Sequence, residues 1–289
     1  MTKICLLFYV YSVLTKSGNL KIHTGLPHFI MKIMVCIKQV IDSDAEIAVD
    51  DASVWPKTDE RAEFHINRFD ECALEEAVLM KDAHKDISVD VISVGPPRVS
   101  DALKRAMGMG CDHAIHIRTD TEGFLSPFVT ASWIAAMALK KKYDLILTGM
   151  LSEDLMQGQV GPIISERLGL PCAVGIVHER LMLPQKKIYT EREIEGGARQ
   201  RLEIDLPAVL AIQTGINQPR YPSLSNLLKA NRYKIEIIDS ASFAHAEPRQ
   251  EVVATGCPRK TRAGRLLAGS QDEKARELYR ILKKKALIL

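Results

Sequence analysis

The segment GMLSEDLMQGQVGP, residues 149–162, is where this chain is best placed to do chemistry. It follows an apolar run and precedes a helical pattern, and ligands of parallel α/β sheets bind at the carboxyl ends of strands. Pro162 suits the first turn of a helix. The free amides around Val160 and Gly161 would then face outward at the positive end of the helix dipole. The segment is therefore a candidate phosphate cradle.

The side chains of the same segment suit a nucleotide. Gly161 lets a ligand approach the backbone closely. Gln159 could bridge a phosphate or ribose, and Asp154 could accept a hydrogen bond from ribose or a ring amine. The chain has neither G-x-G-x-x-G nor a P-loop lysine motif, which argues against a standard dinucleotide fold and against a P-loop. From spacing alone, a plain strand–helix connector remains open.

Metal and nucleophile chemistry finds little support. None of the six cysteines forms a C-x-x-C pair, and most sit in apolar runs, which indicates reduced, buried thiols in a reducing compartment. His113 and His116 form an H-x-x-H, but in a strand-like run they fall on opposite faces. We expect two ordinary histidines, no metal site and no catalytic residue.

Composition limits the function classes. The 289 residues are 46% hydrophobic and 26% charged, which is ordinary for a globular protein. The net charge is only +3 and aromatic residues make up 6%. Without a basic patch carrying interleaved aromatics, nucleic acid is not an expected partner.

The elements that must position the segment alternate between strands and helices. Strand-like runs cover 32–38, 88–94, 113–117 and 143–148, with helical patterns at 70–83, 99–110, 126–142 and up to about 168. This spacing predicts βαβ units and a parallel sheet. Beyond Pro171, strand-like runs separated by turns, including Gly196-Gly197, predict added antiparallel strands. The expected fold is α/β, a doubly wound and mostly parallel sheet with added antiparallel strands and a C-terminal helical arm.

The two ends differ from the middle. ICLLFYVYSVL is too short to span a bilayer as a helix, a signal segment is conceivable, and Met31 opens a natural first strand. We expect residues 1–30 to be a mis-called start or an unstructured leader, with a targeting segment as the minority interpretation. Residues 240–289 are loop-rich and end in a helix, which Ser270 and Glu273 cap as a capping box. That helix could cover its own domain or a partner subunit.

Several stretches carry a resemblance. MKIMVCIKQVID, INRFDECALEEAVLMKD, EREIEGG and NQPRYPSL occur in this order, and the chain from Met31 to the C-terminus resembles the β subunit of electron transfer flavoprotein, whose family includes the FixA proteins. The resemblance implies a Rossmann-like nucleotide-binding domain over 31–239 and an arm over 240–289 that packs on a larger α subunit. FAD would sit mainly on the α subunit, with a structural AMP in the β subunit.

The implied function is electron transfer. The heterodimer would carry electrons from acyl-CoA-type dehydrogenases of fatty acid oxidation to a membrane quinone oxidoreductase or similar acceptor. The chain itself would be no enzyme, would not insert into a membrane, and would be cytoplasmic, or lie in the mitochondrial matrix if eukaryotic. Two alternatives stay open, a bifurcating subunit with a second FAD and NADH use, and a universal-stress-type nucleotide-binding protein. The latter would need a glycine-rich loop that the chain lacks.

The resemblance also assigns the nucleotide site. It places AMP against Cys36, Asn67, Val94, Gly149, Asp154, Gln159, Val160 and Gly161. Many relatives carry aspartate and threonine at Met156 and Gln157, and often threonine at Val160. These departures keep the backbone cradle but remove hydroxyl donors. EREIEGG and NQPRYPSL resemble the simple electron-carrying branch, which favours a mononucleotide over FAD.

Four further residues take roles from the resemblance. Phe69 would lie near the partner's FAD, with core packing as the alternative. Glu193 would pair with an arginine of the α subunit and Arg192 would organise the same hairpin, with a solvated charge run as the alternative. Leu224 would project from a proline-stiffened loop and anchor in a pocket of the client dehydrogenase. Ser223 or Ser225 would cap the helix that follows.

Overall fold

The computed structural model describes residues 12–14, 20–22, 30–49, 55, 57–58, 62–256 and 264–285. Most of the predicted leader, residues 1–30, lies outside this part. Of the residues 1–30 that the structure describes, β1 (Ser12–Leu14) and β2 (Leu20–Ile22) pair antiparallel. The chain divides into two compact units, Met1–Ala254 and Thr255–Leu289. Each is described by itself below.

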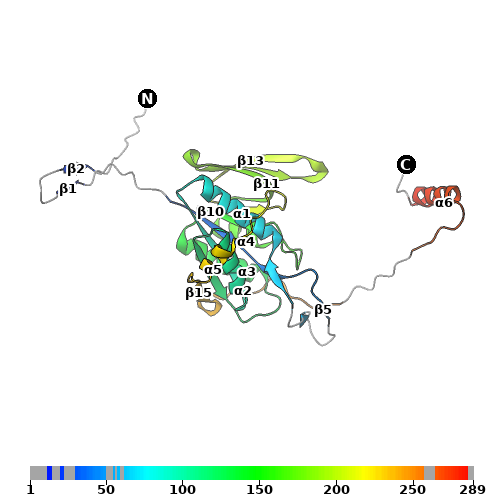
Figure 1. Ribbon diagram of the computed structural model, residues 1–289, viewed down its shortest axis with the longest axis horizontal. Coiled ribbons are helices and arrows are strands. Elements are labelled where there is room, and N and C mark those ends of the chain that lie inside the picture. Colours follow the sequence, from blue (N-terminus) through cyan, green and yellow to red (C-terminus); the bar gives the residue numbers. More distant parts are fainter. Residues whose placement is uncertain are drawn as a thin grey trace, which may run out of the picture. The chain divides into compact units, whose positions relative to one another are not determined.

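A nine-stranded sheet forms the centre of the first unit (Figure 1). Its order is β13-β12-β11-β14-β10-β3-β8-β9-β15. Parallel pairing joins β11 (Cys172–Met182), β14 (Ala208–Ile212), β10 (Leu145–Gly149), β3 (Met31–Cys36), β8 (Ile87–Gly95), β9 (His113–Arg118) and β15 (Glu236–Asp239). Only β12 (Lys187–Glu193) and β13 (Arg199–Asp205) continue it antiparallel. The predicted α/β class and the added antiparallel strands are confirmed.

The strand order reverses beside β3. From β3 the chain proceeds outward through β8 to β9, then returns to place β10 on the other side of β3. The carboxyl ends of β3 and β10 therefore lie at a topological switch point, where doubly wound sheets hold their ligands. The loop after β10 begins at this point.

Helices cover both faces of the sheet. On β3, Ile33 and Val35 pack into the core beneath α1 (Arg68–Ala83) and α2 (Val99–Met109). Met34 and Cys36 point the other way, into the core beneath α3 (Pro127–Lys141) and α4 (Val160–Leu168). This alternation follows the two-residue period of a strand. It explains why the strands show no polar alternation, because neither face meets water.

Glycines end two of these helices, α2 at Gly110 with φ 132° and α4 at Gly169 with φ 64°. Gly108 lies inside α2, one residue before its last position. A Cβ there would come within 3.1 Å of both Pro222 and Leu227. The absence of a side chain at Gly108 thus lets α5 (Leu224–Ala230) pack closely against α2.

Short elements complete the first unit. The strands β4 (Gln39–Ile41) and β7 (Phe64–Ile66) form one antiparallel hairpin, and β5 (Ile47–Ala48) and β6 (Lys57–Thr58) form another. Two 3-10 turns, η1 (Leu183–Gln185) and η2 (Glu195–Gly197), connect strands, and a third, η3 (Ser240–Ser242), follows β15. Of the two histidines of the H-x-x-H, His113 is exposed and His116 is buried.

The second unit contains α6 (Gln271–Lys284). Ser270 and Glu273 form the predicted capping box. The first unit runs to Ala254, and residues after β15 still contact α3, with Phe243 beside Trp133 and Arg249 over the Phe128 ring. Within the part of the chain that the structure describes, no helix has the length and apolar character needed to cross a membrane.

Candidate functional site

A cavity of about 660 Å³ opens at the carboxyl ends of β3, β8 and β10. This volume lies within the range of about 300–1,000 Å³ typical of small-ligand sites. The β4–β7 hairpin, the segment 121–125 and the start of α4 form the other walls. The cavity therefore occupies the switch point.

Seven of the eight residues predicted for the nucleotide line this cavity: Cys36, Asn67, Val94, Gly149, Asp154, Gln159 and Val160. They come from four separate stretches of the chain that the sheet brings together. The eighth, Gly161, lies behind them. A Cβ on Gly161 would meet the Thr148 hydroxyl at 2.7 Å, so a side chain here would push α4 away from β10.

The start of α4 leaves backbone donors for a ligand. Ile163 N–H donates to the Gln159 carbonyl (3.0 Å), and Pro162 has no N–H. Val160 and Gly161 belong to the first turn, where amides have no acceptor within the helix. Thr148 is 3% exposed and lines the cavity, and its hydroxyl has no hydrogen-bond partner within the described residues. Together these donors fit an anionic group at the positive end of the helix dipole.

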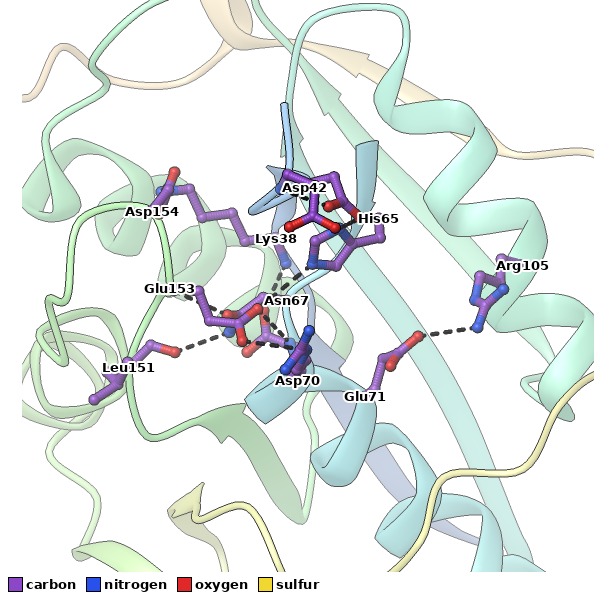
Figure 2. Close-up of polar contacts among 12 residues, drawn as sticks. Lys38, Asp42, His65, Asn67, Asp70, Glu71, Arg105, Leu151, Glu153 and Asp154 are labelled. Atoms are coloured by element: carbon purple, nitrogen blue, oxygen red, sulfur yellow. Dashed lines mark hydrogen bonds and ion pairs between the residues drawn. The ribbon is translucent and has the colours of Figure 1, made fainter. Parts of the chain in front are cut away.

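Asn67 acts on the loop after β10. Its side-chain amide donates to the Leu151 carbonyl (2.8 Å), and its amide oxygen accepts from Glu153 N–H (3.1 Å; Figure 2). Asn67 is only 1% exposed. The prediction made Asn67 a nucleotide ligand. The structure places Asn67 in the cavity wall, where its amide bonds to the loop backbone.

Asp70, in the first turn of α1, ties the two central strand ends together. One carboxylate oxygen accepts from Gly149 N–H and the other from Lys38 N–H, both at 2.8 Å. Burial raises the pKa of Asp70 to about 7, against the opposing effect of hydrogen bonds from Lys38, Asn67 and Gly149. Sequence reasoning missed Asp70, because its partners Lys38 and Gly149 lie 32 and 79 residues away in the sequence.

Lys38 and Asp154 form an ion pair at the mouth of the cavity, with 2.7 Å between Lys38 Nζ and a carboxylate oxygen (Figure 2). Asp154 was predicted as a ribose or ring-amine acceptor, and Lys38 was not singled out. The pair holds the lysine beside the strand end. Because the side chains are 40% and 20% exposed, solvent screens their attraction.

Part of the cavity lining is aromatic. The Arg98 guanidinium lies 4.3 Å from the centre of the Phe64 ring, and Trp55 and Phe124 have ring centres 6.0 Å apart. All four residues line the cavity. Flat apolar surfaces of this kind suit a planar ring system. Sequence reasoning missed them because they come from a hairpin and a loop with no periodic pattern.

Polar side chains gather at the rim. His65 lies 3.6 Å from both Asp42 and Glu153, and Arg68 N–H donates to Glu153 (3.1 Å; Figure 2). Across the residues the structure describes, no group of three or more His, Cys, Asp or Glu side chains could hold a metal ion. Of the cysteines, Cys36, Cys72, Cys111 and Cys172 are free, and only the last is exposed.

The residues predicted to face the partner lie outside the cavity lining. Phe69, half-buried in the first turn of α1, packs its Cβ against Gly149. Arg192 Nε donates to Gln200 across the β12–β13 hairpin (2.8 Å), and Glu193 at the end of β12 is exposed. The structure places this pair on the hairpin, on different elements from Phe69.

Leu224 projects as predicted. It is 73% exposed at the first position of α5, and Tyr221 and Leu228 nearby are 85% and 59% exposed. Ser223 is the cap, since its hydroxyl accepts from Asn226 N–H (3.2 Å). The loop and α5 thus present a small apolar patch.

These features define a doubly wound α/β protein with a ligand cavity at the switch point. Residues 55–242 match the family model described as the electron transfer flavoprotein domain. The chain belongs to the electron transfer flavoprotein family, as its sequence resemblance indicated.

Known proteins of similar sequence are β subunits. The electron transfer flavoprotein subunit beta of Bacillus subtilis is 30% identical over 264 residues, 90% of this chain and 100% of the relative. That of Methylophilus methylotrophus is 30% identical over 262 residues (87% and 98%), and that of Bos taurus is 31% identical over 256 residues (87% and 99%). The resemblance thus extends over nearly the whole of these proteins.

Proposed function

We propose that this chain is the β subunit of a heterodimeric electron carrier. It would shuttle electrons from acyl-CoA-type dehydrogenases to a quinone oxidoreductase or a similar acceptor. Support comes from the family match and from β-subunit relatives aligned over almost their full length. In this role the chain binds and positions, and performs no catalysis of its own. Its location would be cytoplasmic, or the mitochondrial matrix in a eukaryote. The name of an Oryza sativa relative gives that protein as mitochondrial.

The cavity at the switch point would hold a structural AMP. The observation that carries this is the start of α4, where the first-turn amides of Val160 and Gly161 have no acceptor within the helix, beside a cavity lined by Val160 and by the Thr148 hydroxyl, which has no hydrogen-bond partner among the described residues. A phosphate fits these donors. The Phe64 and Trp55 surfaces in the cavity lining would take the adenine ring. Asp154 would stay paired with Lys38 and contribute to the wall.

The FAD would be held mainly by the α subunit, with this chain shaping one side of its site. Phe69 projects from the first turn of α1, which Asp70 ties to the carboxyl ends of β3 and β10. Glu193 and Arg192 on the β12–β13 hairpin would orient the partner through an ion pair. As an exposed pair it would contribute about 0–1 kcal/mol to stability, so its role would be orientation.

The apolar patch around Leu224 would dock the client dehydrogenase. An exposed leucine at the start of a capped helix can fill a partner pocket and act as a small hot spot. The arm containing α6 would pack on the α subunit, where the apolar side of the helix, including Leu278, would be covered.

The experiment that tests the proposal is a nucleotide count. The chain is purified with its α subunit, the complex is denatured, and released nucleotides are identified by mass and absorbance. One FAD and one AMP per αβ pair would support the proposal. Two FAD would assign the protein to the bifurcating class with NADH use, an outcome that the aromatic part of the cavity could accommodate. If the complex released neither AMP nor a second FAD, the loop after β10 would be only a connector between a strand and a helix.

A variant localises the AMP. Gly161→Ala places a methyl group against the Thr148 hydroxyl and displaces the start of α4. We expect the variant heterodimer to release less AMP while its FAD content stays at the wild-type level. Gly256→Ala is the matched control, because a Cβ there meets nothing within 4 Å. Unchanged AMP in Gly161→Ala would show that the phosphate binds elsewhere.

A further inference from the structure

The loop that leads into α5 is held against α1 by one arginine. Arg220 donates from Nε and Nη2 to the Glu75 carboxylate at 3.0 and 2.9 Å, and from Nη1 to Asp82 at 2.9 Å. Its backbone N–H donates to Glu75 as well (3.0 Å). A single side chain thus fixes both the position and the backbone orientation of the loop at residue 220.

Asn217 provides a second attachment three residues earlier. Its side-chain amide donates to the Cys72 carbonyl (2.9 Å) and to the Glu76 carboxylate (2.8 Å). Cys72, Glu75 and Glu76 lie within one turn of α1, so both attachments are on the same side of that helix. The segment between Asn217 and Arg220 therefore has little freedom relative to α1.

Burial makes the Arg220 attachment hard to replace. The Glu75 side chain is 5% exposed, and a buried carboxylate requires a charged, hydrogen-bonding partner. The planar guanidinium reaches Glu75 through two N–H groups and Asp82 through a third. A lysine ammonium is a point charge and cannot reproduce this fork.

The chain becomes exposed directly after this attachment. Tyr221 is 85% exposed, with the Arg105 guanidinium 5.2 Å from its ring centre, and Arg105 itself pairs with Glu71 (3.2 Å; Figure 2). Leu224 follows three residues later, 73% exposed. The apolar patch therefore begins one residue beyond Arg220, whose ion pair holds the buried Glu75 carboxylate.

We propose that Arg220 is a positioning residue for docking of the electron-donating dehydrogenase. By fixing the loop to Glu75 and Asp82, it presents Leu224 in its bound geometry before the partner arrives. Preorganisation lowers the entropy lost when the loop is ordered on binding. This inference rests on the docking role proposed for Leu224. It assigns to Arg220 no contact with FAD, nucleotide or the dehydrogenase.

The test uses the αβ heterodimer with three variants, Arg220→Lys, Leu224→Ala and the control Arg118→Lys. Arg118 also carries an ion pair, 3.6 Å from Asp239, but lies on β9 away from this loop. Hydrogen exchange measures how freely the loop amides open. Steady-state kinetics of an acyl-CoA dehydrogenase, with the heterodimer as the varied substrate, give KM and kcat. FAD content is measured in every variant.

In Arg220→Lys, we expect amides of residues 217–224 to exchange roughly tenfold faster, with the central strands unchanged. The KM for the heterodimer should rise about 3- to 10-fold with kcat and FAD content unchanged, because only encounter geometry is altered. Leu224→Ala should raise KM similarly without faster loop exchange. The control should match the wild type in both measurements.

Distinct results separate the two proposals. If amide exchange in the loop of Arg220→Lys matches that of the wild type, the positioning role is overturned. It is also overturned if Arg220→Lys exchanges faster in the loop but keeps the wild-type KM, while Leu224→Ala raises KM. A wild-type KM in Leu224→Ala rejects Leu224 as the anchor. If Arg220→Lys still raised KM, the loop would dock through another residue and the positioning role would stand. If neither variant raised KM, both proposals would fall.

Should Arg220→Lys fail to fold, Glu75→Gln takes its place. This change removes the carboxylate charge that Arg220 pairs with and keeps the side-chain shape, and its loop exchange and KM are interpreted in the same way.

Discussion

At the scale of single residues, Asp70 has the strongest effect on the site. Its two oxygens accept from two strand-end amides, Lys38 and Gly149, a pattern that only an acceptor-only carboxylate satisfies fully. Yet it is 7% exposed, and burial raises its pKa from 3.8 to about 7. The residue that joins the strand ends is therefore also one whose ionised form is costly to bury.

This conflict predicts a pH dependence. Between pH 3.8 and about 7, Asp70 holds a proton in the folded protein that it has released in the unfolded chain. The contribution of Asp70 to the free energy of unfolding therefore falls as the pH rises through this window, and it is constant above it. Asp70→Asn has no such group. We expect the Tm of the variant heterodimer to decline less than that of the wild type between about pH 5 and pH 7. Parallel curves would mean that Asp70 is ionised throughout.

The Asp70 side chain packs directly against the backbone of Gly149. A Cβ at this position would collide with the Asp70 carboxylate and lie 2.7 Å from the Phe69 Cβ. We expect Gly149→Ala to lower the free energy of unfolding by about 1–3 kcal/mol through overpacking. Urea unfolding measures the change, with Gly256→Ala as the neutral control. Equal stability of both variants would show that α1 can move aside freely.

At the scale of elements, α5 rests on α2 through one side of a short helix. Leu227 packs on Gly108, whereas Leu228, the next residue, is 59% exposed. A helix of seven residues is too short to be stable without such packing. The side that faces the solvent is then free to serve the proposed docking patch.

The two leucines predict opposite outcomes for the same change. Leu227→Ala should destabilise α5 by about 1–2 kcal/mol, because a half-buried side chain loses its contacts. Leu228→Ala should leave the stability of the helix within about 0.5 kcal/mol of the wild type. Hydrogen exchange of the α5 amides measures both. Similar exchange rates in the two variants would contradict the packing described for Gly108.

At the scale of the whole molecule, the chain separates a sheet unit from a short second unit beginning at Thr255. The proposed arm predicts that deletion of residues 255–289 leaves the sheet unit folded. It should weaken binding to the α subunit by at least about tenfold, which corresponds to 1.4 kcal/mol. Circular dichroism and titration with the α subunit measure the two effects. Wild-type affinity after deletion would remove the arm from the interface.

Part of the candidate site was predictable because it depends on strand ends and helix starts. The run before Gly149 and the pattern after Pro162 located the loop, and the resemblance supplied Cys36 and Val94. Asp70 and Lys38 were not found, since their roles depend on which strands become neighbours. The aromatic part of the cavity, with Phe64 as its example, had no periodic signal. The protein contacts of Asn67 and Asp154 also had no signal in the sequence, because their partners lie far away along the chain.

The sequence by itself determined the α/β class, the elements and the family, because hydrophobic periodicity, glycine stops and family motifs are local properties of the chain. It also placed Leu224 in a proline-stiffened loop between two candidate capping serines, and the structure identifies Ser223 as the cap. Only the tertiary structure decided that β10 returns to lie beside β3, which creates the switch point and brings Asp70 to both strand ends. Likewise, Arg220 meets Glu75 across 145 residues of sequence. Such pairings follow from packing of the whole sheet, which no local pattern encodes.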